Sequence, residues 1–351
     1  MISILQIGDS HIQAGFFPNE VRENLQREFG NAGRGLIVPL KLAGTNEPPD
    51  YAITSPNSWN RSNCITRAAT EEPGMSGMSI VTYDRHIELD IKTKEPFDRI
   101  WAFHHREAPL LTVPDSLSDG ICCPALDNDE MTLIPLSRPV EQIRLCASVA
   151  DSSFAHSAFY GFSLENGRSG VLYHSFGING NTYAAINRNP QIVRQASGLC
   201  PDLVIVSLGT NDSYGASFDP ADADVQITRL IDSIRRNMPA SVLLLTTPME
   251  HCRRIRSKGR TYRKPNPNAC AMRECILRQA ALYRLPVWDF YAAAGGDGAM
   301  GRWADLGIAN ADRVHLSREG YRLQGKLFYD AIMKAYDHYR KHNGELKILL
   351  N

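Results

Sequence analysis

A serine near the start of the chain has the setting of a nucleophile. Residues 2–7 form an apolar run, as in a short strand that a parallel sheet buries on both faces. Gly8-Asp9-Ser10 then ends the run, at the carboxyl end where open α/β sheets place their sites. Rigid backbone holds a hydroxyl there, which suits nucleophilic catalysis. Because a Gly/Asp/Ser turn after a strand is also ordinary, the case for Ser10 depends on partners elsewhere in the chain.

Four later residues could supply such partners. Asp312 and His315 lie three apart before the last predicted helix; on a turn, the carboxylate can bind Nδ1 and leave Nε2 free to take a proton. Asn211 follows a predicted strand and offers an amide donor. Gly180 follows another, and its missing Cβ lets a backbone N–H approach a ligand. Each alone could be a turn or surface residue, but together they predict an acyl-transfer site.

The elements that must position these residues are strands alternating with helices. Apolar runs predict five strands, at 2–7, 171–176, 203–208, 242–247 and 287–290. Amphipathic periodicity predicts helices at 18–29, from Asp219-Pro220 to about 238, at 268–284 and at 318–342. Alternation of this kind indicates βαβ units and a parallel sheet covered on both faces.

Residues 36–168 have a different pattern of apolar and polar residues. Helical periodicity fades there, and short alternating runs recur between turn residues. The runs lie at 78–83, 86–91, 99–103, 142–148 and 158–164. This pattern predicts a β-sandwich or jelly-roll-like domain inserted into the first. The predicted organisation is therefore a discontinuous catalytic domain, 1–35 and 169–351, with an inserted β-rich domain at 36–168.

The polar blocks resemble a known superfamily. Gly8-Asp9-Ser10, Gly180, Gly209-Thr210-Asn211-Asp212 and Asp312-Arg313-Val314-His315 look like the four blocks of the SGNH (GDSL-type) hydrolases. The β insertion before Gly177-Ile178-Asn179-Gly180, together with residues 158–180, 295–300 and Trp303, resembles the peptidoglycan O-acetylesterase branch. Asn181-Thr182 departs from that branch, where a small apolar residue is common, so we expect a different acceptor pocket.

The resemblance implies a flavodoxin-like three-layer α/β/α fold and specific roles for the site residues. Ser10 would attack an ester carbonyl, His315 would act as base and then as acid, and Asp312 would fix the imidazole tautomer. The Ser10 and Gly180 N–H groups and the Asn211 side chain would form the oxyanion hole. Neither a metal nor an organic cofactor is implied.

The function predicted from this resemblance is removal of O-acetyl groups from a polysaccharide, with peptidoglycan as one candidate. Three alternatives remain open: an esterase or lipase acting on other short-chain esters, an acetyltransferase using the same acyl-enzyme, and a glycan-binding protein with a vestigial site. The substrate partner is therefore an acetylated glycan or another small ester.

Composition limits the partners. The 351 residues include 38 basic and 38 acidic residues, so overall charge favours neither nucleic acid nor membrane binding. No apolar run reaches the roughly 20 residues of a membrane-spanning helix. The first strand starts at residue 2, which suggests a removed leader and hence a periplasmic or extracellular protein. Eight cysteines without a C-x-x-C pair argue against a zinc ribbon.

Several other polar residues can be interpreted as either structural or functional. His11 could contact substrate or support the site from behind, and His174 flanks the site in sequence. His104-His105 is interpreted as a strand pair, since no partner stands at metal-ligand spacing. The basic run from Arg253 to Lys264 is interpreted chiefly as a solvated mobile loop; the alternative is an electrostatic guide for an anionic substrate.

Overall fold

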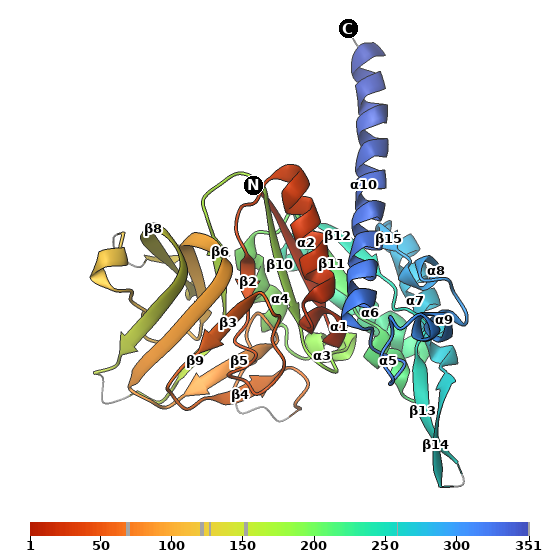
Figure 1. The fold of residues 1–351 in the computed structure, drawn as a ribbon, viewed down its shortest axis with the longest axis horizontal. Helices are drawn as coiled ribbons and strands as arrows, with labels where there is room; N and C mark the ends of the chain where they lie inside the picture. Colours follow the sequence, from red (N-terminus) through yellow and green to blue (C-terminus); the bar gives the residue numbers. More distant parts are fainter. Residues whose placement is uncertain (68–70, 120–122, 126–127, 151–153, 258, 350–351) are drawn as a thin grey trace.

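A five-stranded parallel sheet forms the centre of the molecule (Figure 1). The structure, a computed structural model, describes residues 1–67, 71–119, 123–125, 128–150, 154–257 and 259–349. The sheet has the order β10-β1-β11-β12-β15, and every neighbouring pair is parallel. Its strands are β1 (Ile2–Gly8), β10 (Val171–Gly177), β11 (Leu203–Ser207), β12 (Val242–Thr246) and β15 (Val287–Trp288). All five predicted strands and the flavodoxin-like order are confirmed.

Helices cover both faces of this sheet because its strands are apolar on both faces. Ile4 and Ile205 belong to one buried cluster, which includes Phe17 and Phe328 from the helices. Leu5 and Val204, each adjacent in sequence to one of these residues, point to the opposite face and belong to a second buried cluster. The first face is covered by α1 (Ser10–Gln13), α2 (Phe16–Phe29) and α10 (Arg318–Leu349); the second by α3 (Tyr183–Asn187), α4 (Gln191–Ala196), α6 (Pro220–Asn237) and α7 (Pro267–Tyr283).

The inserted residues form one connected antiparallel sheet of eight strands. Its order is β4-β5-β9-β6-β8-β7, with β2 paired to β9 and β3 paired to β6. The strands are β2 (Gly35–Ile37), β3 (Tyr51–Thr54), β4 (Asn60–Asn63), β5 (Met78–Thr82), β6 (His86–His104), β7 (Cys123–Ala125), β8 (Asn128–Ser148) and β9 (Ser157–Glu165). The runs predicted at 86–91 and 99–103 are a single strand, β6, because a bulge between Lys92 and Arg99 shifts the register without ending the ladder.

The inserted sheet and the parallel sheet share a boundary. The Leu36 N–H donates to His174 Nδ1 of β10 at 3.1 Å, so β2 lies against the edge strand of the parallel sheet. One hydrophobic cluster contains Leu5 of β1 as well as Phe159 of β9. The two parts therefore share a core, and the insertion covers an edge strand that would otherwise be open to pairing.

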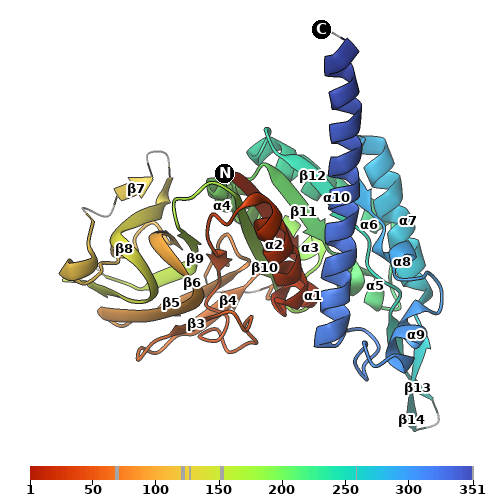
Figure 2. The same ribbon diagram turned by 45° about the horizontal axis from the view of Figure 1, so that its top comes forward.

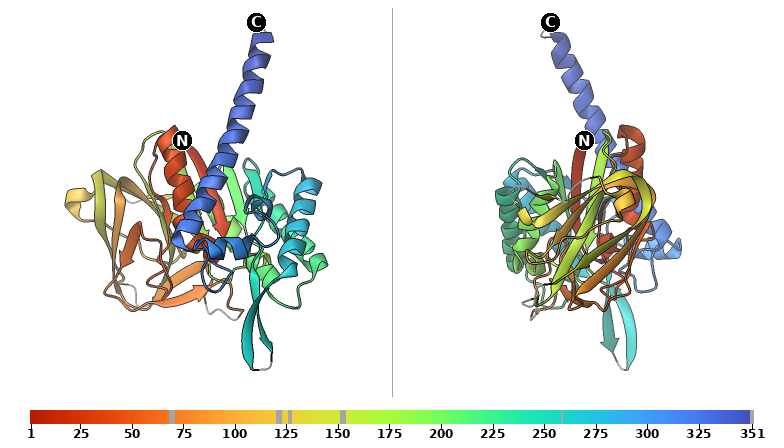
Figure 3. Two further views of the ribbon diagram at one scale, coloured as in Figure 1. Left: turned by 45° about the vertical axis from the view of Figure 1, so that its right-hand side comes forward. Right: turned by 90° about the vertical axis from the view of Figure 1, so that its left-hand side faces the viewer.

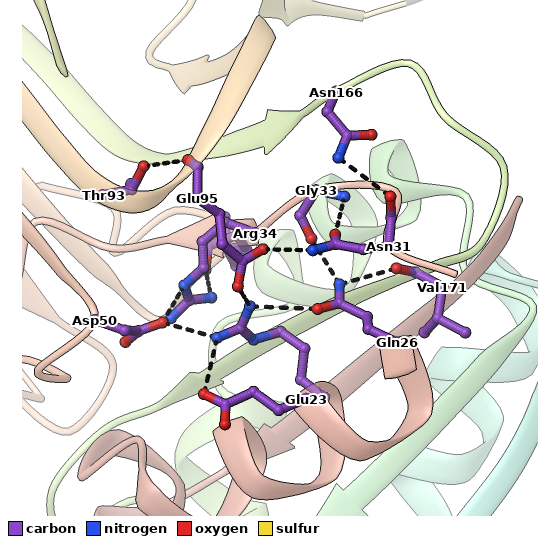
Figure 4. Close-up of polar contacts among 12 residues, drawn as sticks. Glu23, Gln26, Asn31, Gly33, Arg34, Asp50, Thr93, Glu95, Asn166 and Val171 are labelled. Carbon is purple, nitrogen blue, oxygen red and sulfur yellow. Dashed lines mark hydrogen bonds and ion pairs between the residues drawn. The ribbon is translucent and has the colours of Figure 1, made fainter. Parts of the chain in front are cut away.

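A buried polar network reinforces this boundary (Figure 4). Arg22 of α2 is 2% exposed and contacts Asp50 at 3.1 Å and Glu95 of β6 at 2.5 Å. Arg34, 3% exposed, contacts the same Asp50 at 2.6 Å. Burial alone would raise the pKa of Asp50, but Arg34 and Arg22 outweigh that effect and hold it below its usual range. The network thus ties the helix after Ser10 to the inserted sheet.

Two elements project from the body (Figures 1, 2 and 3). The last helix extends from Arg318 to Leu349, beyond the predicted end at 342. The basic run predicted as a loop is a hairpin of β13 (Cys252–Ser257) and β14 (Arg260–Pro265), paired from Cys252↔Pro265 to Ser257↔Arg260. No helix in the described ranges is both long and apolar enough to cross a membrane.

Short helices complete the edge of the sheet where the strands end. They are α5 (Thr210–Tyr214), α8 (Phe290–Ala293) and α9 (Ala299–Asp305). Glu250 accepts hydrogen bonds from the Gly298 and Met300 N–H groups, which fixes the loop that begins α9. The chain then turns through residues 306–317 into α10, and this turn carries Asp312 and His315.

Candidate active site

Ser10 stands at the first position of a short helix directly after β1. The Asp9 carboxylate caps this helix by accepting the His11 N–H at 3.0 Å. The turn needs a glycine at position 8, because a Cβ there would lie 2.1 Å from Cγ1 of Ile12. Close packing of the helix on the strand end therefore fixes the position of the Ser10 backbone.

The structure brings Ser10, His315 and Asp312 into one hydrogen-bonded row. Ser10 Oγ lies 2.9 Å from His315 Nε2, and His315 Nδ1 lies 2.7 Å from Asp312 Oδ2. The other carboxylate oxygen of Asp312 accepts the Val314 and His315 N–H groups, both at 2.9 Å. With Nδ1 protonated toward Asp312, Nε2 is the acceptor facing the serine hydroxyl.

Hydrogen bonding keeps Asp312 charged. Partial burial raises the pKa of its carboxyl group, but the hydrogen bonds from the His315 ring and from the His315 and Val314 N–H groups outweigh that effect and lower it. An ionised Asp312 stabilises a positive charge that forms on the imidazole. The turn that holds it includes Arg313 in the left-handed region, with φ of 53°.

The two predicted oxyanion-hole partners lie beside Ser10. Gly180 has φ of 84°, and no hydrogen bond from its N–H is found within the described part of the chain. Asn211, at the start of α5, donates from Nδ2 to the Asn181 carbonyl at 3.0 Å and to Asp9 Oδ2 at 3.3 Å. An open cleft of about 500 Å³ is lined by both residues together with Ser10 and His315.

Residues from other parts of the chain also line this cleft. Phe16 follows the nucleophile helix, Asn46 belongs to the inserted stretch, and Arg318 and Tyr321 begin α10. Arg318 stacks its guanidinium over the Phe16 ring at 5.3 Å. The reactive row therefore opens into a polar cleft with aromatic walls, to which the insertion contributes directly.

A pair formed by the half-buried His11 and the buried Tyr321 supports the row from behind. His11 Nδ1 lies 3.0 Å from the Tyr321 hydroxyl, and its ring centroid lies 5.2 Å from that of His315. Burial, together with the nearby His315, lowers the pKa of His11 to about 3. The uncharged ring therefore does not repel a protonated His315. Of the two interpretations of His11, the structure favours the supporting one.

Asp9 and Arg263 make contacts at the site that the sequence did not predict. Asp9 is 1% exposed, and burial raises the pKa of its carboxyl group to about 7. Arg263 of the hairpin donates from Nη1 to the Asp312 carbonyl oxygen at 2.7 Å. The Cys252 N–H donates to the Arg313 carbonyl at 2.8 Å. The base of the hairpin thus braces the turn that carries Asp312 and His315.

The side chains of Asn181 and Thr182, which we expect to give a different acceptor pocket, make contacts within the surrounding structure. Asn181 is fully buried, and its amide donates to the Gly8 carbonyl at 3.0 Å, linking the ends of β10 and β1. Thr182 caps α3 by accepting the Ala185 N–H. Both side chains therefore have structural contacts, and the Asn181 carbonyl also accepts the Asn211 amide. The different acceptor pocket stays a prediction.

Two other histidines considered in the sequence, His104 and His174, have structural contacts. His104 is the last residue of β6, with Nε2 2.7 Å from Thr132 Oγ1, but His105 lies just beyond the strand, so the predicted strand pair is correct for His104 alone. His174 is 1% exposed and accepts a backbone N–H. Among the described residues, no group of three or more His, Cys, Asp or Glu side chains could hold a metal ion. Cys122, one of the eight cysteines, lies outside the described residues.

Comparison with known proteins supplies a family and a fold. Residues 151–323 match the model of the GDSL-like lipase/acylhydrolase family. A structure described as "Peptidoglycan O-acetylesterase in action, 5 min" matches with a TM-score of 0.76 at 20% identity, over 95% of this chain and 91% of that one. This match includes the inserted sheet, and at 20% identity it shows the fold alone.

Other solved structures match about half of the chain. A lipase/acylhydrolase from Enterococcus faecalis is 23% identical, with a TM-score of 0.36, over 47% of this chain and 76% of its own. The acetyl xylan esterase AlAXEase is 17% identical, with a TM-score of 0.37, over 46% of this chain and 81% of its own. Comparison with curated protein sequences returned no match.

Proposed function

This chain belongs to the SGNH (GDSL-type) hydrolase superfamily, and we propose that it is a serine esterase that removes O-acetyl groups from a polysaccharide, with peptidoglycan as the first candidate. The match of residues 151–323 to the GDSL-like lipase/acylhydrolase family supports carboxylic ester hydrolysis. The observation that carries the proposal is the row Ser10–His315–Asp312, with separations of 2.9 Å and 2.7 Å, open to a cleft.

The proposed reaction has two half-reactions. Ser10 Oγ attacks the acetyl carbonyl carbon while its proton passes to His315 Nε2. The imidazolium then gives that proton to the departing sugar oxygen, so the glycan leaves with a free hydroxyl and the acetyl group stays on Ser10. Water, deprotonated by His315, attacks the acyl-enzyme and releases acetate. The ionised Asp312 stabilises the imidazolium in both halves.

Three donors are assigned to the oxyanion in this proposal: the Ser10 N–H, the Gly180 N–H and the Asn211 amide. The first two are backbone groups fixed by a helix start and a left-handed glycine. Asn211 already bonds two acceptors, and the longer bond, 3.3 Å to Asp9, is the one an oxyanion can take over. Fixed donors aimed at developing charge lower the barrier without reorganisation.

The polymeric substrate is supported by the inserted sheet. Asn46 of the insertion lines the same cleft as Ser10, and Cδ1 of the insertion's Ile65 would lie 3.4 Å from a Cβ built on Gly180. In the proposed binding mode, a group attached to the acetyl ester lies next to these inserted residues. The structure that matches the insertion as well as the core is described as a peptidoglycan O-acetylesterase. Such a substrate also makes an extracytoplasmic location part of the proposal.

Acetate release tests the proposal. Purified wild-type protein and the Ser10→Ala variant are incubated with O-acetylated peptidoglycan, acetylated xylan and 4-nitrophenyl acetate, and free acetate is measured. We expect wild type to deacetylate at least one glycan and the variant to deacetylate none. Turnover of the small ester alone would refute the glycan substrate. Acetyl transfer to an acceptor sugar without net acetate release would instead identify a transferase, and glycan binding without any turnover a binding protein.

A further inference from the structure

The hairpin β13–β14 concentrates positive charge on a chain that is neutral overall. Residues 252–265 contain five arginines, two lysines and no acidic residue, while the whole chain balances 38 basic against 38 acidic residues. All of β14 is exposed, as are Arg254 and Arg256 of β13. No ion pair involving a hairpin cation is found in the described part of the chain.

This arrangement is unfavourable for the hairpin itself. The antiparallel register sets Arg254 opposite Arg263 and Arg253 opposite Lys264, and like charges directly across a ladder are destabilising. An isolated two-stranded ribbon is only marginally stable even without such pairs. Arg263 bonds the Asp312 carbonyl, but the unfavourable pairing of the other cations is not offset by any ion pair in the described part of the chain, which indicates that their charge serves binding.

The hairpin is joined to the catalytic turn at its base. Arg263 contacts the Asp312 carbonyl oxygen at 2.7 Å, and the Cys252 N–H contacts the Arg313 carbonyl at 2.8 Å. Six residues in each strand extend about 20 Å from that base. The ribbon leaves the body at the edge where the parallel strands end, as Figures 1 and 3 show. A polymer bound along it would have one segment close to Ser10.

We propose that the β13–β14 hairpin is an arm that binds the anionic groups of an acidic glycan and holds that polymer while Ser10 deacetylates it. The proposal rests on the esterase function proposed above and narrows its substrate to polysaccharides that carry carboxylate or other anionic groups. Arginine suits this task because its planar guanidinium pairs with carboxylates through two parallel hydrogen bonds.

Other polyanions fit the ribbon less well. Nucleic-acid binding of this kind uses aromatic side chains for base stacking, and Tyr262, 45% exposed, is the single aromatic residue among 252–265. A membrane-inserting hairpin needs an apolar tip, whereas the sequence at 257–260 is Ser-Lys-Gly-Arg and contains no large apolar residue. Acidic glycans require neither feature.

The test uses a triple variant, Arg254→Gln, Arg256→Gln and Arg260→Gln, which leaves the Arg263 contact in place. Its control, Arg229→Gln, Arg236→Gln and Lys326→Gln, removes three exposed charges from α6 and α10. Acetate release is measured on O-acetylated polygalacturonate, on the same polymer with its carboxylates methyl-esterified, and on 4-nitrophenyl acetate. The methyl-esterified polymer differs from the acidic one in charge, so the pair isolates the ionic contribution.

For the hairpin variant we expect KM on the acidic polymer to rise about tenfold, the sum of three exposed ion contacts of ordinary strength. We expect KM on the methyl-esterified polymer and kcat on the small ester to stay within about twofold of wild type. Added salt should raise the wild-type KM on the acidic polymer more than that of the variant. The control triple should behave as wild type on all three substrates.

A binding measurement separates failure of the arm from failure of the esterase proposal. Fluorescence anisotropy of labelled, acetyl-free polygalacturonate reports affinity whether or not acetate is released. Equal affinity of wild type and the hairpin variant for this probe would overturn the inference. So would a larger loss of affinity for an oligonucleotide or for phosphatidylglycerol vesicles than for the glycan.

Discussion

Substituting Arg22 by methionine should destabilise the protein by about 3 kcal/mol. Arg22 is 2% exposed, and its guanidinium contacts Asp50 at 3.1 Å and Glu95 at 2.5 Å. Removing one partner of a buried ion pair costs roughly 3–5 kcal/mol, because the other charge stays buried. We expect a loss at the lower end of that range, because both carboxylates keep another partner. Asp50 still contacts Arg34 at 2.6 Å, and Glu95, which is 26% exposed, still accepts a hydrogen bond from Asn31.

Urea unfolding, followed by far-UV circular dichroism and tryptophan fluorescence, measures this loss. The matched control is Arg27→Met on the same helix, whose guanidinium is exposed and bonds only Asn24 among the described residues; it should change the free energy of unfolding by less than about 0.5 kcal/mol. Adding Glu95→Gln to Arg22→Met should recover part of the loss, because the carboxylate that Arg22 no longer balances is then neutral, while Asp50 keeps its ion pair with Arg34. A loss below about 1 kcal/mol for Arg22→Met would refute the reasoning that the network is a buried charge cluster.

Three further predictions concern the site. Ser10→Ala should lower kcat by a factor of about 10⁴ or more, and adding His315→Ala should cost little more, because the row acts as a unit; retention of several per cent of wild-type activity by the folded single variant would contradict this. Asn211→Ala should lower kcat by about 10²–10³ with little change in KM, and an effect on KM alone would make it a substrate-binding residue. Burial raises the pKa of Asp9 from 3.8, its value in the unfolded chain, to about 7 in the folded protein. Between these two pH values the folded state keeps a proton that the unfolded state has lost. The contribution of Asp9 to the free energy of unfolding therefore falls as pH rises toward 7. Asp9→Asn should therefore lose less unfolding free energy than wild type between pH 5 and pH 8, as urea titrations at the two pH values will show; an equal loss would mean that Asp9 is ionised throughout.

The boundary between insertion and core limits which experiments are informative. Phe159 of the inserted sheet and Leu5 of β1 belong to one hydrophobic cluster, and Leu36 bonds His174 of the parallel sheet. Deleting the insertion would expose this surface and remove Asp50 and Glu95 from the Arg22 network. Point substitutions on exposed strands therefore test a role in substrate selection better than deletion.

The sequence by itself determined the elements and the order in which they carry reactive groups. Each strand of the parallel sheet is an apolar run, and each long helix has an apolar stripe, so local periodicity was enough to predict them. Because parallel strands present their carboxyl ends at one edge, the positions of Ser10, Gly180 and Asn211 after three strands predicted their proximity. Asp312 and His315 needed no long-range information, since three residues on one turn set their contact.

Tertiary structure alone decided which polar residues are buried and what they contact. The Arg253–Lys264 run has no apolar alternation, so its sequence indicated a loop; pairing across the ladder and two bonds to the 312–313 backbone make it a hairpin. His11 and Tyr321 are 310 positions apart, and Arg22 and Glu95 are 73 apart. Periodicity reports which face of an element is apolar, not which distant segment covers it. The low pKa of His11 and the raised pKa of Asp9 follow from that covering, because only burial by remote residues removes the water that would solvate their charges.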